Sequence, residues 1–260
     1  MSNSDKDLID LQDVAPAEVA EVDLYQRRER IYTRKVEGFF QKVRLYTGWP
    51  LLLGYFALPW LSWNDRQAIL FDLPERKFHI LGLTFWPQDF PMLAFLLIIS
   101  AYLLFAVTTF AGRIWCGYTC PQTVWTTMFM WVEQKTEGSR NQRIKLDKAP
   151  MSLEKFSKKL MKHAAWFFIA FMTGLTFVGY FYGIHELVVD FAAAQVAGWA
   201  LFWTLFFTVA TYVNAAYMRE QVCTYMCPYA RFQSVMFDQD TLIVSCLLYT
   251  SDAADDASSV

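Results

Sequence analysis

Four long stretches without a charged side chain constrain the fold of this chain more than any other feature. They span residues 45–64, 90–112, 164–184 and 191–218. Each is long enough to cross the hydrocarbon core of a bilayer as a helix, which takes roughly 20 residues. Buried helices of a large soluble protein are the alternative. However, 55% of the 260 residues are hydrophobic, so too little polar sequence remains to cover four such helices. We therefore predict an all-α membrane protein with four transmembrane helices.

The first of these stretches is the least regular. It contains Gly48, Pro50, Gly54 and Pro59, which a membrane helix tolerates only where neighbours satisfy the freed backbone groups. The polar residues before it lack the short apolar core and cleavage site of a signal peptide. We expect this first membrane helix to be the targeting element.

The distribution of Lys and Arg predicts the orientation in the membrane. Eight of them precede the first stretch and ten lie between the second and the third. Three lie between the first and the second, and none lies between the third and the fourth. The positive-inside rule then predicts a bacterial inner-membrane protein whose N-terminus (1–44), second loop and C-terminal segment are cytoplasmic. The net charge of −2 gives no indication of a nucleic-acid partner.

Two similar segments, each with a cysteine pair, follow the second and fourth stretches. The first reads RIWCGYTCPQTVW and the second REQVCTYMCPYARF. Aligning Cys116 with Cys223 also aligns Cys120 with Cys227, and an arginine and a proline flank each pair. Since the cytosol keeps thiols reduced, paired cysteines at this place indicate metal or redox chemistry more than structural disulfides.

The proline after each pair predicts that a helix begins there, because proline suits the first helical position. We expect cytoplasmic amphipathic helices over residues 122–134 and 229–239. The predicted domain, 45–244, therefore consists of two transmembrane hairpins, each followed by a Cys-x-x-x-Cys-Pro turn and such a helix. The second cysteine of each pair, Cys120 or Cys227, then sits at a helix N-terminus, which together with the nearby arginines favours the thiolate form.

If the two repeats pack side by side, their four thiolates meet at one membrane edge. The predicted metal ligands are Cys116, Cys120, Cys223 and Cys227. Such a soft ligand set suits Cu(I), Zn(II) or an iron–sulfur cluster, and the spacing does not decide between them. Four cysteines without a metal and a purely structural zinc site are the other interpretations.

Two loops carry weaker signals. The β-prone segments QAILF and KFHILGLTF, separated by DLPE, predict a hairpin on the extracytoplasmic side. The polar, basic residues 138–162 are typical of a solvated linker or of contact with anionic headgroups.

The motifs WCGYTCPQTVW and REQVCTYMCPYARFQSVM, with the basic segment YQRRERIYTRKVEGFFQKVR, resemble the CcoG family, also called FixG or RdxA. The resemblance covers roughly residues 24–244. It implies a polyferredoxin-like protein that works with the assembly factors of the cbb-type cytochrome c oxidase and reduces Cu(II) to Cu(I). Copper or an iron–sulfur cluster would then be held by the paired cysteines.

The chain departs from the family after residue 244. Members continue into a ferredoxin-like domain whose cysteine runs hold two [4Fe–4S] clusters, so we expect those clusters to lie in a region missing from this chain. The tail CLLYTSDAADDASSV does not fit the family. We therefore expect residues 245–260 to be non-native, the gene product to be truncated or chimeric, and Cys246 not to belong to the site.

Three other functions remain open. A quinol-linked electron-transfer subunit of a periplasmic reductase would share the Cys-x-x-x-Cys-Pro signal. A membrane thiol–disulfide enzyme would cycle a Cys116–Cys120 disulfide without a metal. A scaffold clipped by zinc would hold the metal without redox activity.

Overall fold

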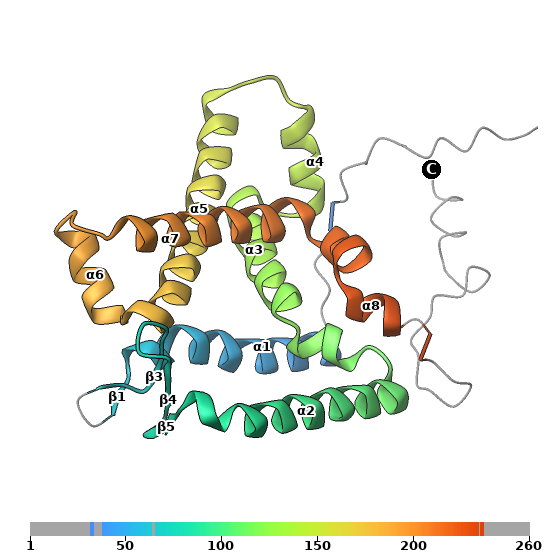
Figure 1. Ribbon diagram of the computed structural model, residues 1–260. Helices are drawn as coiled ribbons and strands as arrows, with labels where there is room; N and C mark the ends of the chain where they lie inside the picture. Colours follow the sequence, from blue (N-terminus) through green and yellow to red (C-terminus); the bar gives the residue numbers. More distant parts are fainter. Residues whose placement is uncertain (1–31, 34–37, 64–65, 234, 237–260) are drawn as a thin grey trace, which may run out of the picture. The chain divides into compact units, whose positions relative to one another are not determined.

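The computed structural model describes residues 32–33, 38–63, 66–233 and 235–236, and this described part of the chain is mostly helical (Figure 1). The predicted N-terminal segment, 1–44, lies largely outside the described residues, and so does the predicted tail, 245–260. The helices are α1 (Phe39–Ala57), α2 (Phe90–Ala111), α3 (Pro121–Glu137), α4 (Arg140–Lys148), α5 (Leu153–Tyr182), α6 (Ile184–Ala192), α7 (Gly198–Tyr212) and α8 (Pro228–Gln233). Two 3-10 turns, η2 (Leu58–Trp60) and η3 (Pro87–Asp89), and three π-helical turns, η4 (Trp115–Thr119), η5 (Val213–Met218) and η6 (Val222–Met226), connect some of them.

Among the described residues, three helical segments are long and apolar enough to cross a membrane, namely Pro87–Ala111, Leu153–Tyr182 and Gly198–Met218. They correspond to the second, third and fourth predicted spans. The protein is therefore a multi-pass membrane protein, as the apolar stretches predict.

The first predicted span, 45–64, is not among the candidate spans of the described residues. The helix α1 begins inside the basic segment and contains Pro50. It ends at Ala57, where the turn η2 follows, so its uncharged part is shorter than a membrane crossing requires. Four spans in two hairpins are thus not confirmed.

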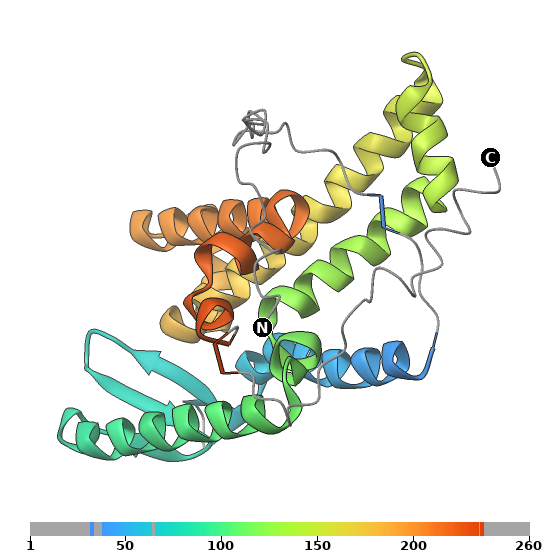
Figure 2. The ribbon, with the colours of Figure 1, turned by 90° about the vertical axis from the view of Figure 1, so that its right-hand side faces the viewer.

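The helices α5 and α7 pack against each other in opposite directions (Figure 2). Leu175 and Val178 of α5 lie against Ala200 near the start of α7, whereas Trp166 and Ala170 lie against Ala215 beyond its end. Between these clusters, Gly174 lets the two backbones approach. A Cβ atom placed on Gly174 would lie 2.8 Å from the carbonyl oxygen of Thr204. Small residues permit such close packing of membrane helices.

The helix α3 is a packed helix rather than the surface helix that the sequence predicts. Phe129 and Val132 are buried in one cluster with Trp166 and Ala170 of α5. Trp166 also donates a hydrogen bond from Nε1 to the carbonyl oxygen of Phe129 at 3.0 Å. As a result, the segment that follows the first cysteine pair is fixed to α5.

The predicted hairpin between the first two apolar stretches is present. Strands β3 (Ile69–Asp72) and β4 (Lys77–Ile80) are antiparallel, with Asp72 opposite Lys77, and β5 (Leu83–Phe85) adds a third strand beside β4. The short strands β1 (Ser62–Trp63) and β2 (Arg66–Gln67) form a separate pair. The ring of Phe71 in β3 lies 5.5 Å from that of Phe181, so the hairpin packs on the end of α5.

Candidate metal centre at the two cysteine turns

The first cysteine turn begins where α2 ends. Gly112 caps α2 with a φ of 58°, a left-handed conformation that glycine adopts without steric cost. The π-helical turn η4 follows, and the backbone N–H of Cys120 closes it by donating to the carbonyl oxygen of Trp115 at 2.9 Å. Pro121 then occupies the first position of α3, as the sequence predicts.

The second cysteine turn repeats this geometry at equivalent positions. Arg219 ends η5 with a φ of 36°, and it aligns with Gly112 when the cysteine pairs are aligned. In η6, the N–H of Cys227 donates to the carbonyl oxygen of Val222 at 2.8 Å, and Pro228 begins α8. The internal repeat is therefore structural as well as sequential.

The residue that follows each proline reaches across to the other repeat. Gln122 donates from Nε2 to the carbonyl oxygens of Asn214 and Arg219, at 3.2 Å each. At the equivalent position of the second repeat, the hydroxyl of Tyr229 is hydrogen-bonded to that of Thr108 in α2. These contacts hold the two cysteine turns beside one another.

Gln233 of α8 also contacts the first cysteine turn, although nothing in the sequence analysis pointed to this residue. It is only 2% exposed. Its Nε2 donates to the carbonyl oxygen of Gly112 at 3.1 Å, and its Oε1 accepts from the thiol of Cys116 at 3.6 Å. A neutral side chain with no recognisable spacing gives no signal for such a long-range contact.

All four cysteines of the turns are free and half-buried. Burial, followed by the neighbouring Cys120, Cys227 and Cys223, raises the pKa of Cys116 to about 11. Burial, followed by Cys120 and Cys227, also raises the pKa of Cys223. Cys116 and Cys223 are the first cysteines of their pairs, and at both of them desolvation outweighs the effects that favour a thiolate. The mutual effects show that the two pairs lie in one region.

The thiols do not form a closed ligand shell. Within the described residues, no group of three or more His, Cys, Asp or Glu side chains is arranged to hold a metal ion. The four predicted ligands thus share a region and a chemistry. Their joint coordination of a metal stays a prediction.

Buried ion pairs lie next to the second turn. Glu133 of α3 pairs with Arg219 at 2.9 Å and with Arg143 at 3.3 Å, and Glu137 pairs with Lys162 at 2.6 Å. Burial tends to raise the pKa of Glu133, but the charges of Arg219, Arg143 and Lys162 lower it overall. The interpretation of residues 138–162 as a solvated linker is wrong for Arg143 and Lys162, which are buried.

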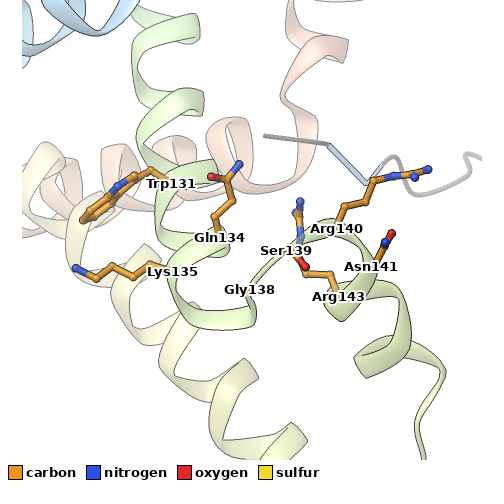
Figure 3. Close-up of a pocket in the computed structure, with 8 residues that line it drawn as sticks. All are labelled: Trp131, Gln134, Lys135, Gly138, Ser139, Arg140, Asn141 and Arg143. Carbon is orange, nitrogen blue, oxygen red and sulfur yellow. The ribbon is translucent and has the colours of Figure 1, made fainter. Parts of the chain in front are cut away.

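A pocket of about 830 Å³ lies beside these ion pairs, at the corner between α3 and α4 (Figure 3). The described residues that line it are Trp131, Gln134, Lys135, Gly138, Ser139, Arg140, Asn141 and Arg143. Lys135 lies over the ring of Trp131, with its Nζ 5.1 Å from the ring centroid. Arg143 connects the pocket with Glu133 and, through it, with the bend at Arg219.

Comparison with protein families identifies two iron–sulfur segments. A 4Fe-4S binding domain matches residues 93–137, which include the first cysteine pair. A 4Fe-4S dicluster domain matches residues 218–256, which include the second pair and Cys246. The expectation that the iron–sulfur regions lie in a missing part of the protein is therefore wrong, since both matches lie inside this chain.

Curated relatives match most of the chain. It is 40% identical over 227 residues to the nitrogen fixation protein FixG of Rhizobium meliloti, covering 85% of this chain and 43% of FixG. It is 39% identical over 230 residues to protein RdxA of Cereibacter sphaeroides, covering 85% of this chain and 48% of RdxA. Protein RdxB of the same organism is 39% identical over 227 residues. The chain thus spans about half the length of these relatives, and no solved structure matches it.

The membrane helices and the two matched segments define the class, which is a multi-pass membrane iron–sulfur protein. Within that class, the chain is a FixG/RdxA-family homologue, as its two cysteine motifs indicate.

Proposed function

We propose that Cys116, Cys120, Cys223 and Cys227 together ligate one [4Fe–4S] cluster, and that this chain is the membrane part of an electron-transfer protein. The observation that carries the proposal is the pair of equivalent turns, each inside a matched iron–sulfur segment, whose thiols perturb one another. The chain has five cysteines, and an all-cysteine cluster takes four. The chain therefore provides ligands for one such cluster, shared between the repeats.

The residues of the site fit this group chemically. Half-buried thiols that lie close together oppose one another's ionisation. A positively charged iron core would compensate the negative charge of the thiolates and so favour their ionised form. Cys120 and Cys227 each precede a helix that begins with proline, so backbone N–H groups face the same region. When bound, the cluster would supply one-electron redox chemistry, while the turns hold the ligands and limit access of water.

We further propose that both turns face the cytoplasm of a bacterial inner membrane. The support is the excess of Lys and Arg on the side where the turns lie. Alkaline phosphatase fused after residue 82 should be active, and the enzyme fused after residue 140 should be inactive. Activity after residue 140 would contradict this orientation. The fusion after residue 82 also reports whether α1 crosses the membrane, because α1 is the apolar helix that precedes the fusion point.

The finer proposal is that the electrons serve assembly of the cbb-type oxidase by reducing Cu(II), as substrate, to Cu(I). Its support is the family resemblance, and because the chain spans half of its relatives, the activity belongs to the whole protein. Each electron leaving the reduced protein converts one Cu(II) to one Cu(I). Protein reduced with dithionite and freed of excess reductant should yield Cu(I), detected by a Cu(I)-specific chelator. An equal yield from a variant without the four cysteines would contradict this.

Electron paramagnetic resonance tests the cluster itself. We expect the dithionite-reduced protein to show the signal of a reduced [4Fe–4S] cluster, which is lost in the C223S/C227S variant. Zinc as the only metal at the site would instead support the alternative of a scaffold that holds zinc without redox activity. A quinol-linked subunit would be indicated by re-reduction of the cluster by a quinol analogue and by a stable complex with a periplasmic reductase.

A further inference from the structure

Each cysteine turn begins at a bend whose carbonyl group is held by a glutamine of the other repeat. In the first turn the bend is Gly112, and its carbonyl oxygen accepts from Gln233 at 3.1 Å. In the second turn the bend is Arg219, and its carbonyl oxygen accepts from Gln122 at 3.2 Å. Gln122 is carried by α3, which follows the first cysteine pair, and Gln233 by α8, which follows the second.

We propose that Gln122 and Gln233 are positioning residues of the four-cysteine site, and that each one fixes the cysteine turn of the opposite repeat. For metal binding this inference rests on the proposed function. For the arrangement of the thiols it does not, since the contacts join protein groups to protein groups. The consequence is that neither cysteine pair takes its place independently of the other repeat.

The bends need such partners for a physical reason. The last carbonyl groups of a helix have no partner within the helix, and leaving a buried one without a hydrogen bond is unfavourable. Both bends have positive φ, and at Arg219 this conformation is strained for a residue with a side chain. The surrounding contacts must hold Arg219 there. Its N–H donates to the carbonyl oxygen of Asn214 at 2.8 Å, and Gln122 binds both carbonyls of this turn.

The two glutamines differ in one respect that an experiment can use. Gln233 contacts the sulfur of Cys116, whereas the hydrogen bonds that Gln122 makes within the described part of the chain go to backbone carbonyls. The thiol donates in this contact, and a thiolate that binds iron carries no proton, so the contact belongs to the metal-free protein. Without metal, replacing Gln233 should therefore remove a contact to a cysteine side chain as well as one to the turn backbone, while replacing Gln122 removes backbone contacts.

The arrangement can be measured without metal. The full chain carrying C246S is purified, freed of metal and oxidised briefly with diamide, and its disulfides are identified by peptide mapping. Disulfides between the pairs report that the two turns lie together, and disulfides within a pair report local structure. Q122M and Q233M retain the length of the side chain but lose its hydrogen bonds. Q134M is the matched control, because Gln134 lies on α3 away from both turns, at the corner with α4.

We expect Q122M and Q233M each to lower the fraction of between-pair disulfides by about fivefold, the scale of losing one or two buried hydrogen bonds. Within-pair disulfides and the Q134M protein should stay unchanged. Equal between-pair yields in all variants would overturn the proposal, and so would a C246S parent that forms none. If between-pair disulfides fall in both variants but no variant binds iron, the positioning role stands and the cluster proposal fails.

Discussion

Glu133 accepts a hydrogen bond at 2.9 Å from Nη2 of Arg219, a residue 86 positions further along the chain. The contact joins the helix after the first cysteine pair to the bend before the second. Arg219 also lies 5.8 Å from the ring centroid of Trp166, over which Lys162 lies at 4.9 Å. A buried carboxylate thus fixes the cation that starts the second cysteine turn.

Replacing Glu133 by alanine should destabilise the protein strongly. The side chain of Glu133 is 4% exposed and pairs with both Arg143 and Arg219, so its removal takes a carboxylate away from two cations in the interior. Breaking a buried pair in this way costs about 3–5 kcal/mol. We expect the melting temperature in detergent to fall by roughly 5–10 °C. The matched control is E154A, because Glu154 pairs with Lys158 at an exposed position and its loss should be silent. Equal melting temperatures for E133A and E154A would contradict the role of the buried pair.

The same carboxylate predicts a dependence of stability on pH. The pKa of Glu133 is lowered below its ordinary value of 4.5, so its ionised form stabilises the folded state. This contribution is complete above the unfolded-state pKa and is lost as the pH falls through the folded-state pKa. The difference in melting temperature between wild type and E133Q should be constant from about pH 6 to 8 and should shrink below about pH 4.5. A difference in melting temperature that grew as the pH fell would contradict the lowered pKa of Glu133.

Gly174 should be intolerant of even one methyl group. A Cβ atom there would lie 2.8 Å from the Thr204 carbonyl oxygen and 2.9 Å from the Thr208 backbone nitrogen, and neither can move without shifting α7. We expect G174A to lose about 1–3 kcal/mol of stability, measured by thermal unfolding in detergent. G54A is the control, because a Cβ at Gly54 meets nothing within 4 Å. A G174A protein as stable as G54A would show that α5 and α7 are less closely packed.

In the metal-free protein, the thiol of Cys116 should react slowly with alkylating agents. Its pKa of about 11 means that little thiolate is present near neutral pH. Alkylation of Cys116 by iodoacetamide at pH 8, followed by mass spectrometry, should be roughly tenfold or more slower than that of a model thiol. The rate should rise as the pH approaches 11. Rapid alkylation of Cys116 at pH 7 would instead indicate a lowered pKa and would contradict the burial of this thiol.

Features with a local pattern could be read from the sequence. The uncharged stretches located α2, α5 and the segment that contains α7, because a membrane helix is defined by its own composition. Pro121 and Pro228 also marked the starts of α3 and α8, because proline favours the first position of a helix through its own local geometry. The cysteine spacing revealed the repeat and the segments that match iron–sulfur domains.

Features that depend on partners distant in the sequence could not be predicted from the sequence. The pairing of Glu133 with Arg219 and the contact of Gln233 with Gly112 join residues far apart in sequence, and no spacing rule connects them. Arg143 and Lys162 lie in a basic run, so only the fold reveals that they are buried. The raised pKa of Cys116 also had no signal in the sequence, because burial is a property of the packed turns.

The most direct test of the central claim is the iron and acid-labile sulfide content of the chain. The protein would be purified anaerobically in detergent, beside C116S/C120S/C223S/C227S and the control C246S. We predict about four iron and four sulfide per chain in the wild type and in C246S, and almost none in the fourfold variant. Zinc alone in the wild type, or iron and sulfide retained by the fourfold variant, would contradict a cluster held by these cysteines.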